Sequence, residues 1–497
     1  MNKREVGKLL QKDGKIMQEK TDYLKKFLQH ELEEIVGAEY VVTDQAEIDC
    51  QSVDVWWATR YWFFKGTDLP QPSAIVFPEN KQEVVRLVKF CSEHKVPFVP
   101  RGGGAGDSGG SLALKDGIII DLKRMNHVLE LNEKSLTVRV QPGIIQKHLE
   151  EYLNRRGYTM NHFPASFNTS ALGGFISTNG TGVLSSRYGK ICEMVHQLEV
   201  VLPSAKIFRS LPVRFHSTGP DYSRLFFGAE GTLGIITEAL CKIYYLPEKR
   251  AFRSFVLPNL GEGIEAGRKI MANQLMPSLM RLYDEADTRL ILKDQFGLDQ
   301  EGCAILLGFD GLKRIVDVQM EVASDILTKA GGEDIGEELG KQWWAHRYKS
   351  YYPPNDYICK PWITAVSDTV APYEDIEKIY WAMKKTVEEG FKKWEAQFHA
   401  HFSHWYDWGT SVYPTFLIKN VPEDKKEALS LYNRILDACE RASIDNGGVI
   451  NEHHGIGMRS GRLMREIYGE SYDLALLIKR ALDPYNLMNP GKLGLGD

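Results

Sequence analysis

The chain has 497 residues, a length that predicts two or three domains. Its composition, 43% hydrophobic and 26% charged, is typical of a globular protein, and no apolar run approaches the roughly 20 residues that a membrane-spanning helix needs. The formal net charge of -5 gives no electrostatic reason for nucleic acid to bind, so we expect none as a partner.

The N-terminal part combines charged residues with apolar residues at helical spacing. Residues 4–36 therefore predict one or two surface helices. An aromatic cluster follows: Trp56, Trp57, Tyr61, Trp62, Phe63 and Phe64. We expect this cluster to pack in a core or between domains, because a chain of this length can bury it; a membrane-docking patch is the alternative.

From Pro72 the pattern becomes one of alternating short strands and helices. The expected elements are strands at 74–77, 96–99, 118–122 and 136–140, and amphipathic helices at 81–94 and 145–156. This order predicts an α+β layout.

The strand ending at Val99 leads into a segment with six glycines in the ten positions from Arg101 to Gly110. Glycine reaches positive φ cheaply, and successive amide N–H groups in such a turn form an anion site suited to a pyrophosphate. There is no P-loop motif, and no strand–G-x-G-x-x-G–helix unit near the start of the chain. A flexible linker is the alternative for this run alone. Two further glycine-rich segments, at 171–182 and 228–237, favour an extended ligand held by backbone groups at several points.

Glycine becomes less frequent near Pro247, which suggests a domain boundary there. A strand at 303–309 and a long helix at 374–397 are expected in the second half, and a last helix ends before Asp483. We therefore expect an N-terminal extension leading into the first domain at 1–70, that domain at 71–248, a second domain at 249–440 and a closing segment at 441–497.

Several motifs, in order, resemble the vanillyl-alcohol-oxidase (PCMH-type) family of FAD-binding flavoproteins. They are P-S-A-I-V-F-P at 72–78, R-G-G-G at 101–104, P-G at 142–143, L-G-G-F-I-S-T-N at 172–179, R-Y-G at 187–189, G-A-E-G-T-L-G-I-I-T at 228–237 and D-P-Y-N-L-M-N-P-G-K at 483–492. The resemblance implies a two-subdomain PCMH-type FAD-binding domain with an α+β cap domain over the flavin ring, and a closing segment that returns to the FAD site.

The resemblance also implies which residues hold FAD. They are Arg101, Gly102, Gly103, Gly104, Ala105, Gly106 and Ser108, Pro142 and Gly143, Gly173, Gly174, Ser177 and Thr178, and Glu230, Gly231, Thr232 and Ile236. Some members attach the flavin through a histidine near the place of Ala105. Because alanine has no nucleophile, we expect FAD to be bound non-covalently.

Two branches of the family compete for the function. One contains alkyldihydroxyacetonephosphate synthase, which exchanges an acyl chain for an alkyl chain; the other contains FAD-linked D-2-hydroxy-acid dehydrogenases of the D-lactate or glycolate type. The S-T-G-P-D segment at 217–221 and the segment at 277–284 that contains Arg281 resemble the synthase. A capped turn and a surface salt bridge are the respective alternatives.

The expected reaction centre combines histidines with a tyrosine. Many dehydrogenases of the family are thought to bind a divalent metal through two histidines, H-x-x-x-x-x-x-H, and an E-H-G-I-G segment. In this chain His401 or His404 stands near the place of the first histidine, and Tyr413 replaces the second. His453 and His454 precede G-I-G. A phenol is a poor metal ligand, so we expect no metal. On the synthase reading Tyr413 is the general base or acid, His453 and His454 supply a cationic field, and Arg281 holds a phosphate.

Further roles follow from the same resemblance. Asp221 and Asp407 are predicted to contact the substrate, and His401, His404 or Asp407 to orient Tyr413. On the dehydrogenase reading His454 takes the hydroxyl proton and Arg281 holds a carboxylate. A third hypothesis, a flavin-binding or electron-transfer subunit without catalysis, is disfavoured because it would need none of these side chains.

The location and partners are also predicted. Seven scattered cysteines without a C-x-x-C pair, no secretory signal and no terminal S-K-L favour the cytoplasm. We expect a small-molecule or lipid-phosphate substrate, a homodimer and, as a possibility for lipid substrates, peripheral contact with a membrane.

Overall fold

The computed structural model describes residues 28–66, 70–113, 117–296, 300–349 and 362–496. Most of the N-terminal helical prediction lies outside these residues. Residues 28–36 are helical, and Leu32 and Val36 on this helix are buried in a core shared with the first sheet.

The first sheet has four strands: β1 (Val41–Val42), β2 (Ala74–Val76), β3 (Phe98–Arg101) and β4 (Ile118–Asp121). Their order is β1-β2-β4-β3, with β2 and β3 parallel to β4. Helix α4 (Lys81–His94) begins at Asn80, whose side chain accepts a hydrogen bond from the Glu83 amide, and it buries an apolar face. Short elements precede β2: η1 (Ala38–Tyr40), α2 (Gln45–Gln51) and α3 (Trp57–Phe64). The sequence predictions for the elements around the glycine loop are confirmed to within two residues at each end.

A second, antiparallel sheet follows in the order β5-β6-β10-β8-β9. Its strands are β5 (Val128–Asn132), β6 (Thr137–Val140), β8 (Val195–Val201), β9 (Ile207–Arg209) and β10 (Ile235–Lys242). The helices and small strands around it are η2 (Leu122–Arg124), α5 (Gln146–Asn154), β7 (Tyr158–Thr159), α6 (Leu172–Ser177), α7 (Ser185–Tyr188), α8 (Ile191–Met194), η3 (Tyr222–Phe226) and β11 (Tyr244–Tyr245). All three glycine-rich segments belong to the part of the chain that forms these two sheets.

The second half is built on a nine-stranded antiparallel sheet. Its strands are β12 (Lys249–Leu257), β13 (Leu279–Tyr283), β14 (Cys303–Gly311), β15 (Glu333–Gly336), β16 (Ile363–Val366), β17 (Thr369–Pro372), β18 (Gln397–Trp405), β19 (Gly409–Ile418) and β20 (Val449–Ile450). We call this half the cap. Its core is the largest cluster of buried apolar residues among the described segments, and it includes Leu282, Phe402 and Phe416.

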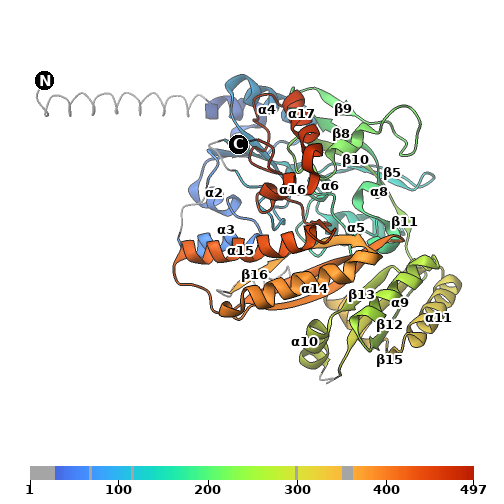
Figure 1. Cartoon of the computed structure of the whole chain (residues 1–497). Coiled ribbons are helices and arrows are strands. Elements are labelled where there is room, and N and C mark those ends of the chain that lie inside the picture. Colours follow the sequence, from blue (N-terminus) through green and yellow to red (C-terminus); the bar gives the residue numbers. More distant parts are fainter. Residues whose placement is uncertain (1–27, 67–69, 114–116, 297–299, 350–361, 497) are drawn as a thin grey trace, which may run out of the picture.

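Helices cover the cap sheet, as Figure 1 shows in yellow and orange. They are α9 (Leu260–Ala272), α10 (Glu285–Phe296), α11 (Lys313–Lys329), α12 (Glu338–His346), α14 (Tyr373–Gly390) and α15 (Lys425–Ile444), with the short η4 (Lys392–Trp394). The helix expected at 374–397 is therefore too long. It ends at Gly390, because from Gln397 the chain has the two-residue alternation of a strand, with Phe398, Ala400 and Phe402 fully or almost fully buried.

The closing segment returns to the first half of the chain. After η5 (Gly461–Leu463) come α16 (Met464–Tyr468), η6 (Gly469–Ser471) and α17 (Tyr472–Leu482), which Figure 1 shows in red beside the blue and green elements. Beyond α17, the Phe98 amide donates to the Leu487 carbonyl and the Asn489 amide donates to the Phe98 carbonyl. The closing segment thereby pairs in parallel beside β3, the strand that leads into the first glycine loop.

The aromatic cluster divides into two parts. Trp56, Trp57 and Tyr61 are buried, and the Trp57 ring stacks on Tyr432 of α15 at 4.8 Å, as expected for packing between the two halves. Phe63 and Phe64 are instead 50% and 66% exposed, so the prediction is wrong for these two residues.

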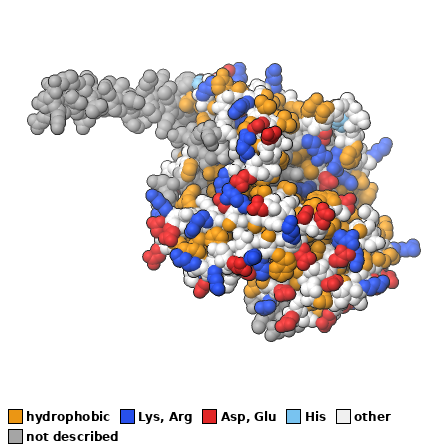
Figure 2. All heavy atoms as spheres, in the orientation of Figure 1, with side chains coloured by type: hydrophobic (Ala, Val, Ile, Leu, Met, Phe, Trp, Pro, Cys, Tyr) orange, Lys and Arg blue, Asp and Glu red, His pale blue; other side chains and the backbone are white. Residues whose placement is uncertain are grey.

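The molecule is thus a mixed α+β protein, as predicted, with two sheets in its first half and a cap. On the face drawn in Figure 2, positive and negative side chains are interspersed. No helix within the described ranges is long and apolar enough to cross a membrane.

Candidate active site

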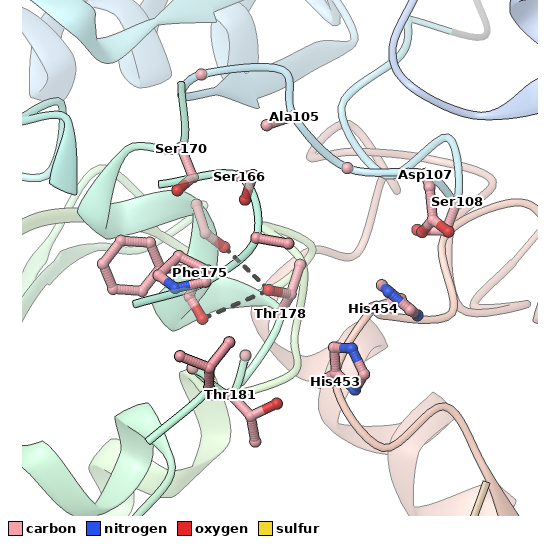
Figure 3. Close-up of a pocket in the computed structure, with 18 of the residues that line it drawn as sticks. Ala105, Asp107, Ser108, Ser166, Ser170, Phe175, Thr178, Thr181, His453 and His454 are labelled. Carbon is pink, nitrogen blue, oxygen red and sulfur yellow. Dashed lines mark hydrogen bonds between the residues drawn. The ribbon is translucent and has the colours of Figure 1, made fainter. Parts of the chain in front are cut away.

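A cavity of about 920 Å³ lies between the glycine-rich segments and the cap sheet. All three glycine segments line it on one side, and β13, β18, β19 and α12 contribute side chains on the other. Figure 3 shows Ala105, Asp107 and Ser108 from the first loop facing the same space as Thr178 and the two histidines His453 and His454.

The first glycine loop presents backbone rather than side chains to this cavity. The amide N–H groups from Gly103 to Gly106 donate to no other described residue, although these residues line the cavity. A Cβ at Gly103 would lie 1.9 Å from the Thr169 carbonyl oxygen, whereas one at Gly106 would meet nothing within 4 Å. The loop therefore packs tightly on one side and offers free donors to an anion on the other.

Most of the residues predicted to hold FAD line this cavity. They are Arg101, Gly102, Gly103, Gly104, Ala105, Gly106, Ser108, Pro142, Gly173, Gly174, Ser177, Thr178, Glu230, Gly231 and Ile236. Gly143 and Thr232 do not line it. Gly143 packs against the Leu122 carbonyl, and the Thr232 hydroxyl donates to the Ala229 carbonyl, so these two residues support the loops from behind.

The two charged residues among those predicted to hold FAD, Arg101 and Glu230, form hydrogen bonds with protein backbone groups. The Arg101 guanidinium donates to the Val53 carbonyl at 3.0 Å. The Glu230 carboxylate accepts from the Ile456 and Gly457 amides at 2.6 and 2.9 Å. Glu230 thus joins the third glycine segment to the turn after the histidine pair. Burial raises its pKa to about 7, despite those two amide donors.

Three neighbouring strands of the cap place the predicted catalytic side chains on one face. Tyr283 of β13 pairs with His401 of β18, which in turn pairs with Tyr413 of β19. Because side chains alternate along a strand, Arg281 lies on the same face as Tyr283. The rings of His401 and Tyr413 stack at 4.7 Å, and Arg281 Nη2 is 2.7 Å from His401 Nε2. A register shift between Phe402 and Trp405 accompanies the change in alternation that lets His404 also line the cavity.

The histidine pair reaches the same face from the closing segment. His454 Nε2 is 3.4 Å from the Tyr413 hydroxyl, and His454 Nδ1 is 2.6 Å from Asp368 Oδ1. His453 Nδ1 is 2.8 Å from Glu452 Oε2 and 3.2 Å from Asp368 Oδ2. The sequence-predicted residues Arg281, His401, Tyr413, His453 and His454 therefore form one continuous set.

The buried carboxylates control the charge of this set. Burial alone would lower the pKa of His453, but Asp368 and Glu452 hold it at about 10. Burial would likewise raise the pKa of Asp368, yet the two histidines keep it well below its usual range. At neutral pH, His453 is thus a cation next to the Tyr413 ring, at 5.7 Å between centroids.

His404 lies at the edge of this cluster. Its Nδ1 is 2.8 Å from Glu452 Oε2, and Lys190 Nζ is 3.0 Å from Glu452 Oε1. Within the described residues, two triads have donor atoms within 4.8 Å of one another, as a metal site requires: Asp368 with His453 and His454, and His404 with Glu452 and His453. In each triad the histidine Nδ1 atoms bind carboxylate oxygens.

Comparisons with known proteins identify the family of this chain. A family model described as "FAD binding domain" matches residues 72–210, and one described as "FAD linked oxidases, C-terminal domain" matches residues 246–493. The glycolate oxidase subunit GlcD of Bacillus subtilis is 30% identical over 85% of this chain and 89% of its own length. The chain belongs to the FAD-linked oxidases.

Other relatives carry the synthase name. The alkyldihydroxyacetonephosphate synthase of Dictyostelium discoideum is 28% identical over 85% of this chain and 73% of its own. A solved structure of an alkyldihydroxyacetonephosphate synthase aligns with a TM-score of 0.80 at 25% identity, over 93% of this chain and 85% of that one. A p-cresol methylhydroxylase structure aligns with a TM-score of 0.75 at 18% identity, over 95% of this chain and 97% of that one, which shows the shared PCMH-type fold.

FAD is therefore the cofactor of this FAD-linked oxidase, and the cavity fits it. The free amides of the first glycine loop suit the pyrophosphate, and the open space at Gly106 and Gly174 lets a ligand approach the backbone. Non-covalent attachment stays a prediction, based on Ala105.

Two predicted substrate contacts lie outside the cavity, and we correct their assignment. The Asp221 carboxylate caps η3, where it accepts from the Ser223 amide and pairs with Arg224. Asp407 is exposed on the turn between β18 and β19, and so it does not orient Tyr413.

The structure adds functional residues that the sequence reasoning missed. Asp368 has no local motif and meets the histidines only through the tertiary fold, whereas Glu452 directly precedes His453 and binds its Nδ1. Asp287 and His399 also line the cavity beside His401. The sequence could have indicated His399, because residues two apart on a strand share a face and His399 precedes His401 by two.

Proposed function

We propose that this protein is an alkyldihydroxyacetonephosphate-synthase-like transferase, which exchanges the acyl chain of acyl-dihydroxyacetone phosphate for a fatty alcohol. The observation that carries the proposal is the Tyr413 hydroxyl facing His454 beside the cationic His453. The synthase relatives and the S-T-G-P-D segment at 217–221 support it.

In this proposal Tyr413 acts as general base towards the alcohol. His454 Nδ1 is 2.6 Å from Asp368 Oδ1, so its Nδ1 proton faces that carboxylate, and Nε2 faces the Tyr413 hydroxyl as an acceptor. His454 Nε2 then takes the phenol proton as the Tyr413 oxygen removes the proton of the alcohol. The His453 cation favours the phenolate form, which an isolated phenol of pKa about 10 would not adopt at neutral pH.

Other side chains bind and orient the substrate. Arg281 offers its planar guanidinium to two oxygens of the phosphate, and the Tyr283 and Trp343 rings lie 5.4 and 5.3 Å from its central carbon. FAD, when bound, supplies the electron-accepting ring at which the reacting substrate carbon is activated.

The alternative function is that of an FAD-linked D-2-hydroxy-acid dehydrogenase. The G-I-G turn after His454 and the glycolate oxidase relative favour it. In that case His454, held by Asp368, takes the hydroxyl proton, and Arg281 holds a carboxylate.

Anaerobic mixing of the purified protein with each substrate tests the proposal. We expect acyl-dihydroxyacetone phosphate plus a fatty alcohol to release fatty acid without net flavin reduction, and D-lactate and glycolate to leave the flavin oxidised. Bleaching by either hydroxy acid would select the dehydrogenase instead. Tyr413→Phe is expected to lower exchange at least about 100-fold. Tyr468→Phe, on an exposed residue of α16, is the matched control.

A lipid substrate also implies contact with a membrane surface. The exposed Phe63 and Phe64 at the end of α3 are apolar side chains available for such contact. We propose a cytoplasmic protein with peripheral membrane contact and a homodimeric state.

A further inference from the structure

The wall of the cavity contains a chain of polar contacts that begins at Arg281. Arg281 Nη2 is 2.7 Å from His401 Nε2, His401 Nδ1 is 3.7 Å from Asp287 Oδ2, and Asp287 Oδ1 is 2.9 Å from His399 Nδ1. All four side chains line the cavity. They come from β13, α10 and β18, which pack against one another.

The distances determine the protons on His401. A guanidinium only donates, so His401 Nε2 must accept from Arg281, and the ring proton is on Nδ1, facing Asp287. Burial and the charge of Arg281 lower the pKa of His401 to about 3, which agrees with a neutral ring. His401 is therefore an uncharged spacer between the arginine and the carboxylate.

His399 balances the charge of Asp287 on its other side. Burial lowers the pKa of His399, but the hydrogen bond and charge of Asp287, helped by Asp284, raise it overall against the opposing charge of Lys384. The raised pKa of His399 favours its protonated form, which pairs with Asp287 at 2.9 Å and offsets the negative charge of that carboxylate near Arg281. Asp287 is the one carboxylate that the described part of the cap contributes to the cavity wall.

The arrangement avoids competition with the substrate. No direct ion pair between Asp287 and Arg281 is present among the described residues, so the carboxylate does not occupy the donors that an anionic substrate needs. The Nε of Arg281 is buried and binds no described residue. A carboxylate in direct contact would hold the guanidinium equally well but would neutralise it.

We propose that Asp287 is a positioning residue that acts through His401 to aim Arg281 at the anionic group of the substrate, while His399 neutralises Asp287. This inference rests on the proposed role of Arg281, which is the same for a phosphate and for a carboxylate. Asp287 thus affects the affinity for the anion rather than the chemical step.

The test uses the FAD-loaded enzyme with inorganic phosphate and oxalate as probes, followed by the flavin absorbance. Asp287→Asn is expected to weaken the binding of whichever anion the wild type takes by about tenfold, to raise KM similarly and to change kcat much less. Asp287→Glu is expected to restore part of the affinity. His127→Gln, on an exposed histidine bonded to Gln141, is the control.

Each other outcome has a distinct meaning. Unchanged anion affinity and KM in Asp287→Asn would overturn the inference, as would a fall in kcat at constant KM. If Arg281→Gln also leaves affinity unchanged, the role of Arg281 itself fails; if only Arg281→Gln weakens binding, the inference fails alone. Should Asp287→Asn not fold, His399→Gln provides the second test: with Asp287 no longer neutralised, anion affinity is expected to fall, and unchanged affinity would overturn the inference.

Discussion

The carboxylate of Asp368 binds both histidines of the active site, one through each oxygen, and also accepts from the His453 amide. Tyr413, His453 and His454 could be predicted from the sequence because each belongs to a local motif. Asp368 could not be, because it lies in the turn between β16 and β17, and only the tertiary fold brings that turn to the histidines.

Asp368→Asn removes the anion that keeps His453 charged. We expect the alkaline limb of the pH profile of kcat/KM to move to lower pH, because the pKa of His453 falls. The free energy of unfolding is expected to drop by about 3 kcal/mol at pH 7, as for other broken buried pairs. This loss should shrink below about pH 4, where the unfolded carboxyl binds a proton. It should also shrink as the pH rises from about 6.5 to about 10, because over that range His453 is neutral in the unfolded chain but still charged in the folded protein. Urea unfolding across this range measures it, and a loss independent of pH would contradict the assignment.

Elements were predicted unevenly. The strand and helix before the first glycine loop carry strong local signals, an Asn cap and a regular apolar face, and both were predicted correctly. Strands β18 and β19, which hold His401 and Tyr413, were not. In β18, histidine and serine residues alternate with the buried Phe398, Ala400 and Phe402, so the strand lacks a continuous apolar run. The residues before β18 have the pattern of a continuing helix.

The glycine loop offers a sharp test at this scale. Gly103→Ala places a Cβ 1.9 Å from the Thr169 carbonyl oxygen, so the loop must move away from the 169–171 segment. We expect at least a tenfold loss of FAD affinity, about 1.4 kcal/mol. The ratio of flavin to protein after gel filtration measures the loss. Gly390→Ala, where a Cβ meets nothing within 4 Å and φ is not positive, should keep full flavin content.

At the scale of the whole molecule, the closing segment joins both halves. Arg459 is 3.0 Å from Asp107 in the first glycine loop and 2.8 Å from Asn451, just before the histidines. Asn489 donates to the carbonyls of Gly110 and Glu230, in the first and third glycine segments. The family resemblance implied this return, but composition and periodicity could not show it, since no local pattern records which distant segments meet.

Arg459→Met tests the contact between the closing segment and the first glycine loop. Removing a buried cation leaves Asp107 uncompensated, which costs about 3–5 kcal/mol. We expect a matching decrease in the free energy of urea unfolding, together with a lower flavin content. Arg465→Met, on an exposed arginine paired with Asp473, should stay within about 0.5 kcal/mol of the wild type. Equal effects of the two variants would refute this role for Arg459.

The return of the chain end also orders events during synthesis. The glycine loops emerge from the ribosome first, but the turn that Glu230 binds and the arginine that pairs with Asp107 follow 226 and 352 residues later. The nascent first half therefore leaves its cofactor cradle open on one side until this later segment has been synthesised. FAD loading is expected to follow the synthesis of this segment.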